Sequence, residues 1–313
     1  MILAGAEDDL AKLPPGNWIG GTAAGFLTPD GLAETAGQLI YADLSPIAAS
    51  TVLRVASARQ LRNLSQFYPE NGFAMIIMPG QSDLLRAIAT RMPDWPSLYN
   101  TPLVGWVSGV PLSEIGRRQP SIFCGTGKPR HDHAAIMYVS LPENMFAELK
   151  VVNPFSVTSC TAIRFLERGY DIQDLCQLNG QRVRLNQLIS TGKIDPRLPL
   201  LADKDGALLN NSIIAHDPKA GRVTFLNPID PALTYRFAEL PVSFCDSFAK
   251  ASEGINPATA KLSSICVAGL HHFDETMRHR LPAIAPVTFG QIGYTLLTQT
   301  IACLNLSYIA AFT

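Results

Sequence analysis

The stretch PVTFGQIGYTLLTQTIACLNL, residues 286–306, joins two apolar runs through a glycine-containing turn. Gly290 and Gly293 lie three positions apart between β-prone residues, a spacing that indicates close backbone approach or φ angles that other residues avoid. Residues 295–306 are rich in Thr, Ile and Leu, which predicts one strand buried on at least one face. This stretch therefore predicts a strand, a tight turn and a second strand.

The composition is that of a globular protein, with 47% apolar and 16% charged residues in 313. A net charge of −1 without a basic run provides no field to attract nucleic acid or an anionic membrane surface. No stretch reaches the ~18 apolar residues of a membrane helix, and the first residues lack a signal-peptide pattern. The six cysteines form no CxxC pair. We therefore expect a cytoplasmic protein with reduced thiols that binds neither nucleic acid nor membranes.

Strand and helix patterns alternate in the first part of the chain. The apolar run at 72–80 predicts a central strand covered on both faces, and strands are also expected at 38–42 and 50–56. Helical spacing covers residues 58–67, and Ser82 is a suitable N-cap for a helix that reaches Arg91. The alternation predicts an α/β protein of mixed α+β type.

The length allows two domains of ordinary size. We expect two related lobes, residues 1–158 and 159–313, each a mixed β-sheet flanked by helices. A cleft between the lobes is the predicted ligand site, because pockets at domain interfaces often bind small molecules. A short helix is expected within residues 1–13, before Pro14.

The segment IGGTAAG, residues 19–25, places small residues directly after an apolar run. One interpretation is a strand that ends in a glycine turn. The other is a binding segment in which the backbone of Gly20 and Gly21, together with Thr22, faces a ligand. The spacing is neither that of a P-loop nor that of a dinucleotide-binding turn.

A similar pattern occurs at PLVGWVSG, residues 102–109, with Gly105 and Trp106 at its centre. The following loop contains His131 and His133, which lie on the same face if they enter a strand. A metal site is one hypothesis for this pair, although zinc needs three or four protein ligands and no obligatory third is found. The alternative is a solvated strand edge.

Cys266 lies in the apolar segment SSICVAG, residues 263–269. A strand cysteine among apolar residues usually serves packing. A thiol lining a pocket is the alternative, and an enzyme with Cys266 as nucleophile would need a positive neighbour to lower its pKa. The sequence identifies no such neighbour and no catalytic acid–base pair.

Several of these segments resemble the FIST domain, a two-part sensory module of bacterial signalling proteins. The resemblance rests on the order and spacing of IGGTAAG, PLVGWVSG, SSIC and PVTFGQIG, the last followed by TQT. Gln291 replaces the Glu of the family, Trp106 replaces a glycine, and Gly269 stands at the place of an Arg. These departures indicate a divergent member.

The resemblance implies a stand-alone, small-molecule-binding sensory module that acts in trans through a signalling partner protein. Some family members bind haem, so haem or a metal ion is the alternative cofactor, and an enzyme using Cys266 or a His131/His133 metal centre is a further alternative. The residues expected to bind the ligand are Gly20, Gly21, Thr22, Gly105, Trp106, Cys266, Gly290, Gln291 and Gly293.

Overall fold

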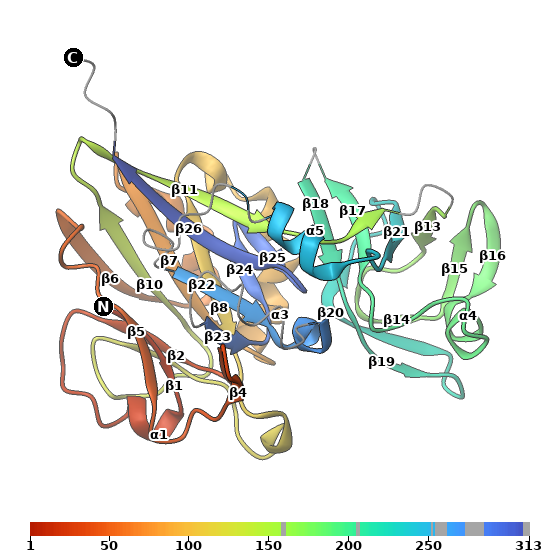
Figure 1. The fold of residues 1–313 in the computed structure, drawn as a ribbon, viewed down its shortest axis with the longest axis horizontal. Helices are drawn as coiled ribbons and strands as arrows, with labels where there is room; N and C mark the ends of the chain where they lie inside the picture. Colours follow the sequence, from red (N-terminus) through yellow and green to blue (C-terminus); the bar gives the residue numbers. More distant parts are fainter. Residues whose placement is uncertain (158–160, 205–206, 252, 254–261, 273–284, 309–313) are drawn as a thin grey trace. The chain divides into compact units, whose positions relative to one another are not determined.

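The computed structural model describes residues 1–157, 161–204, 207–251, 253, 262–272 and 285–308. Within these residues the protein is mainly β, with five sheets and few, short helices (Figure 1). The α/β expectation is therefore corrected, because strands predominate in the described residues and the helices are too few and too short to flank every sheet. No helix of the described residues has the length and apolar character needed to span a membrane.

The chain forms two compact units. Unit 1 comprises Met1–Val152, Ser252–Leu296 and Ile301–Thr313, and unit 2 comprises Asn153–Ala251 and Leu297–Thr300. Each predicted lobe was one continuous range of residues, whereas unit 1 combines the first half of the chain with segments near its end.

A six-stranded sheet forms the centre of unit 1. In spatial order its strands are β25 (Thr295–Leu297), β24 (Gln291–Gly293), β8 (Leu103–Ser108), β7 (Gly72–Pro79), β10 (Ala134–Ser140) and β6 (Ser50–Ala56). β7 runs parallel to β8 and antiparallel to β10. After Gly72 every residue of β7 is buried, as its uninterrupted apolar sequence predicted.

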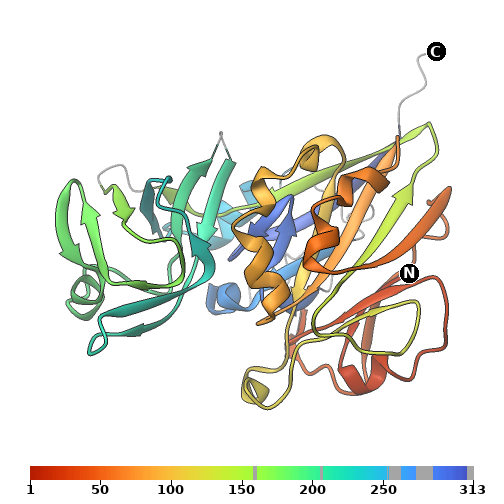
Figure 2. The ribbon, with the colours of Figure 1, turned by 180° about the vertical axis from the view of Figure 1, so that it is seen from behind.

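Short helices cover one face of this sheet (Figure 2). They are α2 (Ala58–Leu61), η1 (Leu64–Phe67), α3 (Asp83–Ala89), η2 (Met92–Asp94) and η3 (Leu98–Asn100). The helix expected at 58–67 is thus two separate turns. The Ser82 hydroxyl accepts a hydrogen bond of 3.2 Å from Leu85 N and caps α3 as expected, but α3 ends at Ala89, before Arg91.

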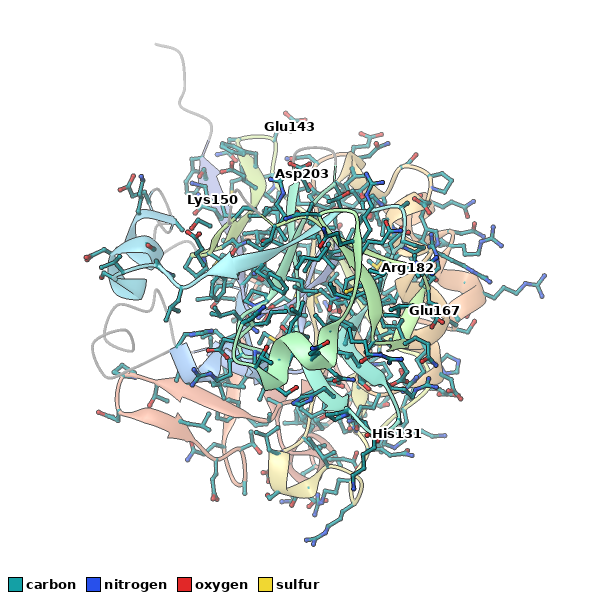
Figure 3. The ribbon with its side chains drawn as sticks, turned by 90° about the vertical axis from the view of Figure 1, so that its right-hand side faces the viewer. His131, Glu143, Lys150, Glu167, Arg182 and Asp203 are labelled. Carbon is teal, nitrogen blue, oxygen red and sulfur yellow. The ribbon has the colours of Figure 1, made fainter. Side chains whose placement is uncertain are left out.

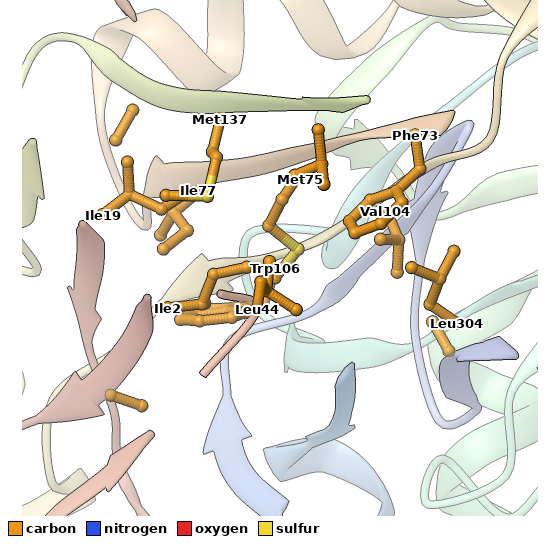
Figure 4. Close-up of a cluster of buried hydrophobic side chains, with 14 of the residues drawn as sticks. Ile2, Ile19, Leu44, Phe73, Met75, Ile77, Val104, Trp106, Met137 and Leu304 are labelled. Carbon is orange, nitrogen blue, oxygen red and sulfur yellow. The ribbon is translucent and has the colours of Figure 1, made fainter. Parts of the chain in front are cut away.

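The opposite face packs against the two other sheets of unit 1 (Figure 4). One contains β5 (Leu39–Ala42), β1 (Ile2–Gly5), β2 (Ile19–Thr22) and β9 (Ile122–Cys124). The other contains β11 (Met145–Val152), β26 (Ile301–Tyr308), β22 (Leu262–Cys266), β23 (Ala285–Thr288), β3 (Gly25–Thr28) and β4 (Gly31–Ala33). Alternate side chains of β7, Phe73, Met75 and Ile77, enter this core, which also contains Ile19 and Leu304.

The short helix expected within residues 1–13 is present, and a strand precedes it. Ile2–Gly5 forms β1, which pairs with both β2 and β5, and only Glu7–Leu10 is helical (α1). β1 is the inner strand between β2 and β5, and all of its residues are buried. Two further short turns are η4 (Leu112–Glu114) and η5 (Val267–His272).

The strand expected at 295–306 is interrupted. β25 ends at Leu297, and β26 begins at Ile301 in a different sheet. Between them, Gln299 has a φ of +51°. The Thr298 hydroxyl donates to Asn210 O at 3.1 Å, and the amide of Gln299 donates to Arg197 O at 3.0 Å. These bonds place residues 298–300 in unit 2 as a buried polar turn.

Unit 2 contains two sheets around a separate core. The larger has β16 (Gln181–Arg184), β15 (Leu175–Leu178), β13 (Ile163–Phe165), β21 (Tyr235–Glu239), β17 (Leu200–Lys204) and β18 (Ala207–Asn211), with β12 (Ser156–Val157) pairing β21. The smaller has β14 (Gly169–Gln173), β20 (Arg222–Ile229) and β19 (Ile213–Asp217); the helices are α4 (Leu185–Ser190) and α5 (Phe244–Ala251). Phe165 meets Phe225 and Tyr235 edge-on, with ring centroids 5.5 and 5.4 Å apart.

Candidate functional site

A pocket of about 560 Å³ lies in unit 1, a size within the usual range of small-molecule sites. Its wall is formed by residues 6–8, 22–24, 32–36, 109–114, 118, 119, 267, 270 and 287. These segments belong to α1, the β2–β3 junction, β4 and its continuation, the loop after β8, η5 and β23. β4, β23 and the loop after β8 are neighbours in both Figure 1 and Figure 2.

Strand ends make the apolar part of the pocket. Gly109 N donates to Thr22 O at 3.0 Å, which joins the ends of β8 and β2, and Ala24 N donates to Val287 O at 2.7 Å. Ala23 and Val110, the residues that follow these strand ends, are 1% and 4% exposed. The backbone groups of this wall are therefore satisfied by strand-like pairing, and small apolar side chains line the pocket.

The charged part of the wall is acidic. Arg118 contacts Asp8 at 3.1 Å and Glu114 at 3.4 Å. The hydrogen bond that Arg118 donates to Asp8, together with the nearby carboxylates, raises the pKa of Arg118 above its ordinary value. Glu7 and Glu34 also line the pocket, and neither forms an ion pair within the described residues. Carboxylates thus outnumber basic groups in this wall.

Of the predicted ligand residues, Thr22 lines this pocket. Its hydroxyl is already engaged, since it accepts a 3.0 Å hydrogen bond from Ser121 N. Gly20 and Gly21 are buried in β2. A methyl group added at Gly21 would lie 2.6 Å from Ile77 Cγ2 and 3.0 Å from Trp106 Nε1, so this glycine allows close packing of β2 on the central sheet.

Gly105 and Trp106 lie in β8, within the core. A methyl group at Gly105 would overlap the carbonyl oxygen of Ile76 in β7. Trp106 is 4% exposed, and its indole N–H has no hydrogen-bond partner within the described residues. The indole fills space beside Gly21, as expected for a residue larger than glycine at this position.

Gly290, Gln291 and Gly293 lie beside β8, the strand that contains Gly105 and Trp106. Gln291 is opposite Trp106, and the carbonyl oxygen of Gly290 accepts a 2.9 Å hydrogen bond from Val107 N. Gly290 has a φ of +148°, which favours glycine. Gln291 is fully buried, and its amide donates to Ser264 O at 3.2 Å. The glutamine therefore links β24 to β22.

Cys266 is fully buried at the end of β22, where it is opposite Thr288. The pocket wall begins one residue later, at Val267. An enzymatic role for Cys266 would require the thiol to become accessible to substrate, because it lies behind this wall.

The two predicted metal ligands have other partners. His131 Nδ1 lies 3.0 Å from Pro120 O, and His133 Nδ1 lies 2.6 Å from Asp132 Oδ1 (Figure 3 labels His131). The described residues contain no group of three or more His, Cys, Asp or Glu side chains arranged to hold a metal ion. The His131/His133 site and a haem site stay predictions.

The structure thus brings the predicted segments together. Their central residues pack in the protein interior, and the residues adjacent to them in sequence line the pocket. IGGTAAG contributes its threonine and alanines, the β8 segment contributes Gly109 and Val110, and the segments around Cys266 and Gly290 contribute Val267 and Val287.

One protein-family model matches residues 1–307 and describes a family of unknown function, DUF6976. The chain belongs to the DUF6976 family. Comparison with curated proteins and with solved structures gives no match. The DUF6976 match includes every segment of the pocket wall, because the wall lies between residues 6 and 287.

Sequence reasoning missed two segments of the DUF6976 pocket, residues 32–36 and 109–119. The first has no motif-like spacing. The second lies largely in the loop after PLVGWVSG, and its Leu112, Glu114 and Arg118 follow no pattern that indicates a site. Only the fold shows that these segments face the end of β2.

Proposed function

We propose that this DUF6976 protein binds a small molecule in the pocket of unit 1. The observation that carries the proposal is the convergence of segments far apart in sequence, around residues 23, 110, 267 and 287, on one pocket of about 560 Å³. Apolar surface of suitable volume with a few charged groups at its edge is the usual form of a ligand site.

The wall contains groups suited to binding rather than catalysis. The apolar residues are alanines, valines, leucines and a proline, and the charged side chains are exposed or half-buried. Asp8 and Glu114 each form an ion pair with Arg118, and the raised pKa of Arg118 keeps this guanidinium charged instead of tuning it for proton transfer. A binding module is therefore the function that this geometry supports best.

The resemblance to FIST domains supports a finer proposal, that binding serves as a signal. In that proposal the chain is a cytoplasmic sensory module, and ligand binding changes its affinity for a signalling partner protein. The loop of residues 109–119 is a suitable contact for such a partner, because it lines the pocket and several of its side chains are exposed.

Native mass spectrometry of the protein purified from its own host tests the binding function. We expect a bound mass in the wild type, and loss of this mass in Ala36→Trp, because Ala36 is an exposed residue of the wall where an indole would fill the pocket without entering the core.

Ala49→Trp is the matched control, since Ala49 is equally an exposed alanine of unit 1 but does not line the pocket. The bound mass should persist in this variant. Equal retention of the mass in both tryptophan variants would contradict binding in the pocket.

A further inference from the structure

We propose that the ligand of the unit 1 pocket is an amphiphilic cation, an aliphatic amine whose chain lies on the apolar wall and whose ammonium group faces Glu7 and Glu34. This inference rests on the proposed function and specifies the class of ligand. It is argued from the distribution of charge, from an unpaired hydroxyl group in the wall and from exposed leucines at its edge.

The charges favour a cation over an anion. Arg118 is the only basic side chain among the described residues of the wall, and it is already paired with Asp8 and Glu114. Glu34 has no ion-pair partner within the described residues, and half-buried Glu7 has only a longer-range attraction to Arg118. A carboxylate ligand would meet repulsion, whereas an ammonium group would provide the missing counter-charge.

Thr35 supplies an independent indication of a polar ligand group. It lines the pocket next to Glu34 and is 3% exposed, yet its hydroxyl makes no hydrogen bond within the described residues. Its oxygen is not among the fully buried unpaired polar atoms of the described residues, so it keeps accessible surface that a donor group of a ligand can reach. An ammonium group has three donors and no acceptor, so it can donate to this hydroxyl oxygen and to a carboxylate together.

Exposed leucines at the edge of the pocket favour a ligand with an aliphatic chain. Leu32 and Leu112 line the pocket from β4 and from the loop after β8, and they are 57% and 59% exposed. The other apolar residues of the wall are Ala, Val, Pro and Leu, without an aromatic ring to stack on a planar ligand. A flexible alkyl chain would cover the exposed leucines and remove their apolar surface from water.

Isothermal titration calorimetry with 1-octylamine, 1-octanol and octanoate tests the class of ligand, because these probes share one chain and differ in charge. We expect 1-octylamine to bind most tightly and octanoate most weakly. The preference for the amine should decrease at high salt, since the interacting carboxylates are partly exposed.

The double variant Glu7→Gln/Glu34→Gln should weaken 1-octylamine binding about fivefold and leave 1-octanol binding unchanged, as expected for exposed ion pairs. Glu143→Gln is the charge-matched control, because Glu143 is an exposed residue of the β10–β11 turn, outside the pocket wall (Figure 3). It should bind all probes like the wild type.

The outcomes separate this inference from the proposed function. If 1-octanol binds and Ala36→Trp abolishes its binding, but 1-octylamine binds no more tightly, only the amine assignment is wrong. Octanoate binding as tight as that of 1-octylamine would likewise overturn the amine assignment alone. If none of the three probes binds the wild type, the pocket assignment and the amine assignment both fail.

Discussion

β8 in unit 1 and residues 298–300 in unit 2 are both buried segments in which small or polar residues interrupt apolar sequence. The two segments differ in how their buried polar groups are accommodated. In β8, Gly105 brings two strands into close contact, while Trp106 Nε1 and Ser108 Oγ have no hydrogen-bond partner within the described residues. In residues 298–300, the Thr298 hydroxyl both donates to Asn210 O and accepts from Ser212, at 3.1 and 3.0 Å.

The difference shows what a pattern of glycine and polar residues indicates. In unit 1 it marks places where backbone and side chains pack too closely for a Cβ atom, and in unit 2 it marks a turn fixed by hydrogen bonds. Neither segment lines the pocket. The pattern therefore predicts close approach of the chain to itself, and pocket-lining residues follow it by one or two positions, as Thr22 and Ala23 follow Gly21.

The largest expected effect is that of Gly105→Ala. The added methyl group would overlap the carbonyl oxygen of Ile76, and the central strands β7 and β8 would have to separate. We expect a loss of about 3 kcal/mol in the free energy of unfolding, at the upper end of overpacking costs. Urea denaturation followed by circular dichroism measures it.

Gly20→Ala is the control for this change, because its methyl group would meet its nearest atoms, Leu10 Cδ2 and Leu3 O, at 3.3 Å. It should destabilise far less than Gly105→Ala. Similar costs at the two glycines would refute the packing role assigned to Gly105.

Thr298→Val tests the hydrogen-bonded turn of unit 2. The change keeps the shape of the side chain but leaves Asn210 O and the Ser212 hydroxyl without this partner. Removing one partner of a buried hydrogen bond costs about 1–3 kcal/mol, so we expect a loss in that range by urea denaturation.

Thr295→Val is the matched control, since Thr295 is 8% exposed and its hydroxyl makes no hydrogen bond within the described part of the chain. We expect it to be nearly neutral. A cost as large at Thr295 as at Thr298 would show that hydrogen bonding does not distinguish the two positions.

A smaller effect comes from the buried thiols of the two cores. Burial raises the pKa of Cys303 in unit 1 to about 12 and that of Cys176 in unit 2 to about 11. Because the folded-state pKa lies above that of an unfolded cysteine, near ~8.5, this stability is fully present below that pH. It is lost at about 1.4 kcal/mol per pH unit for each thiol as the pH rises toward the folded-state value.

Urea denaturation between ~pH 8 and ~pH 10 measures this slope. Cys303→Ala should lower stability at every pH, because it leaves a cavity, but it should make the alkaline slope shallower. Cys124→Ala should change the slope less, since Cys124 is only half-buried. An unchanged slope in Cys303→Ala would contradict the deep burial of this thiol in the folded state.

Parts of the fold follow from local sequence. The apolar run of β7, the boundaries of β6 and the Ser82 cap of α3 agree with expectation, because burial on both faces and capping leave direct traces in the sequence. The mainly β architecture does not follow from local sequence, because β1 and β26 form strands by pairing with segments that are distant in the sequence. The interruption at residues 298–300 depends on hydrogen-bond partners from residues 197–212.

The candidate site was predictable only in part. The glycine-containing segments indicated where strands meet, yet Gly21 and Gly105 contact protein atoms instead of the pocket. Residues such as Glu34 and Leu112 have no sequence signal of their own, because their role depends on the loop arrangement around the end of β2.

Hydrogen–deuterium exchange with and without 1-octylamine is the most direct test of the central claim, that the pocket of unit 1 binds the ligand. The account predicts slower amide exchange in residues 31–36 and 109–119 when the amine is present, and no change in residues 163–239 of unit 2. Slower exchange confined to unit 2, or to the β10–β11 turn, would contradict it.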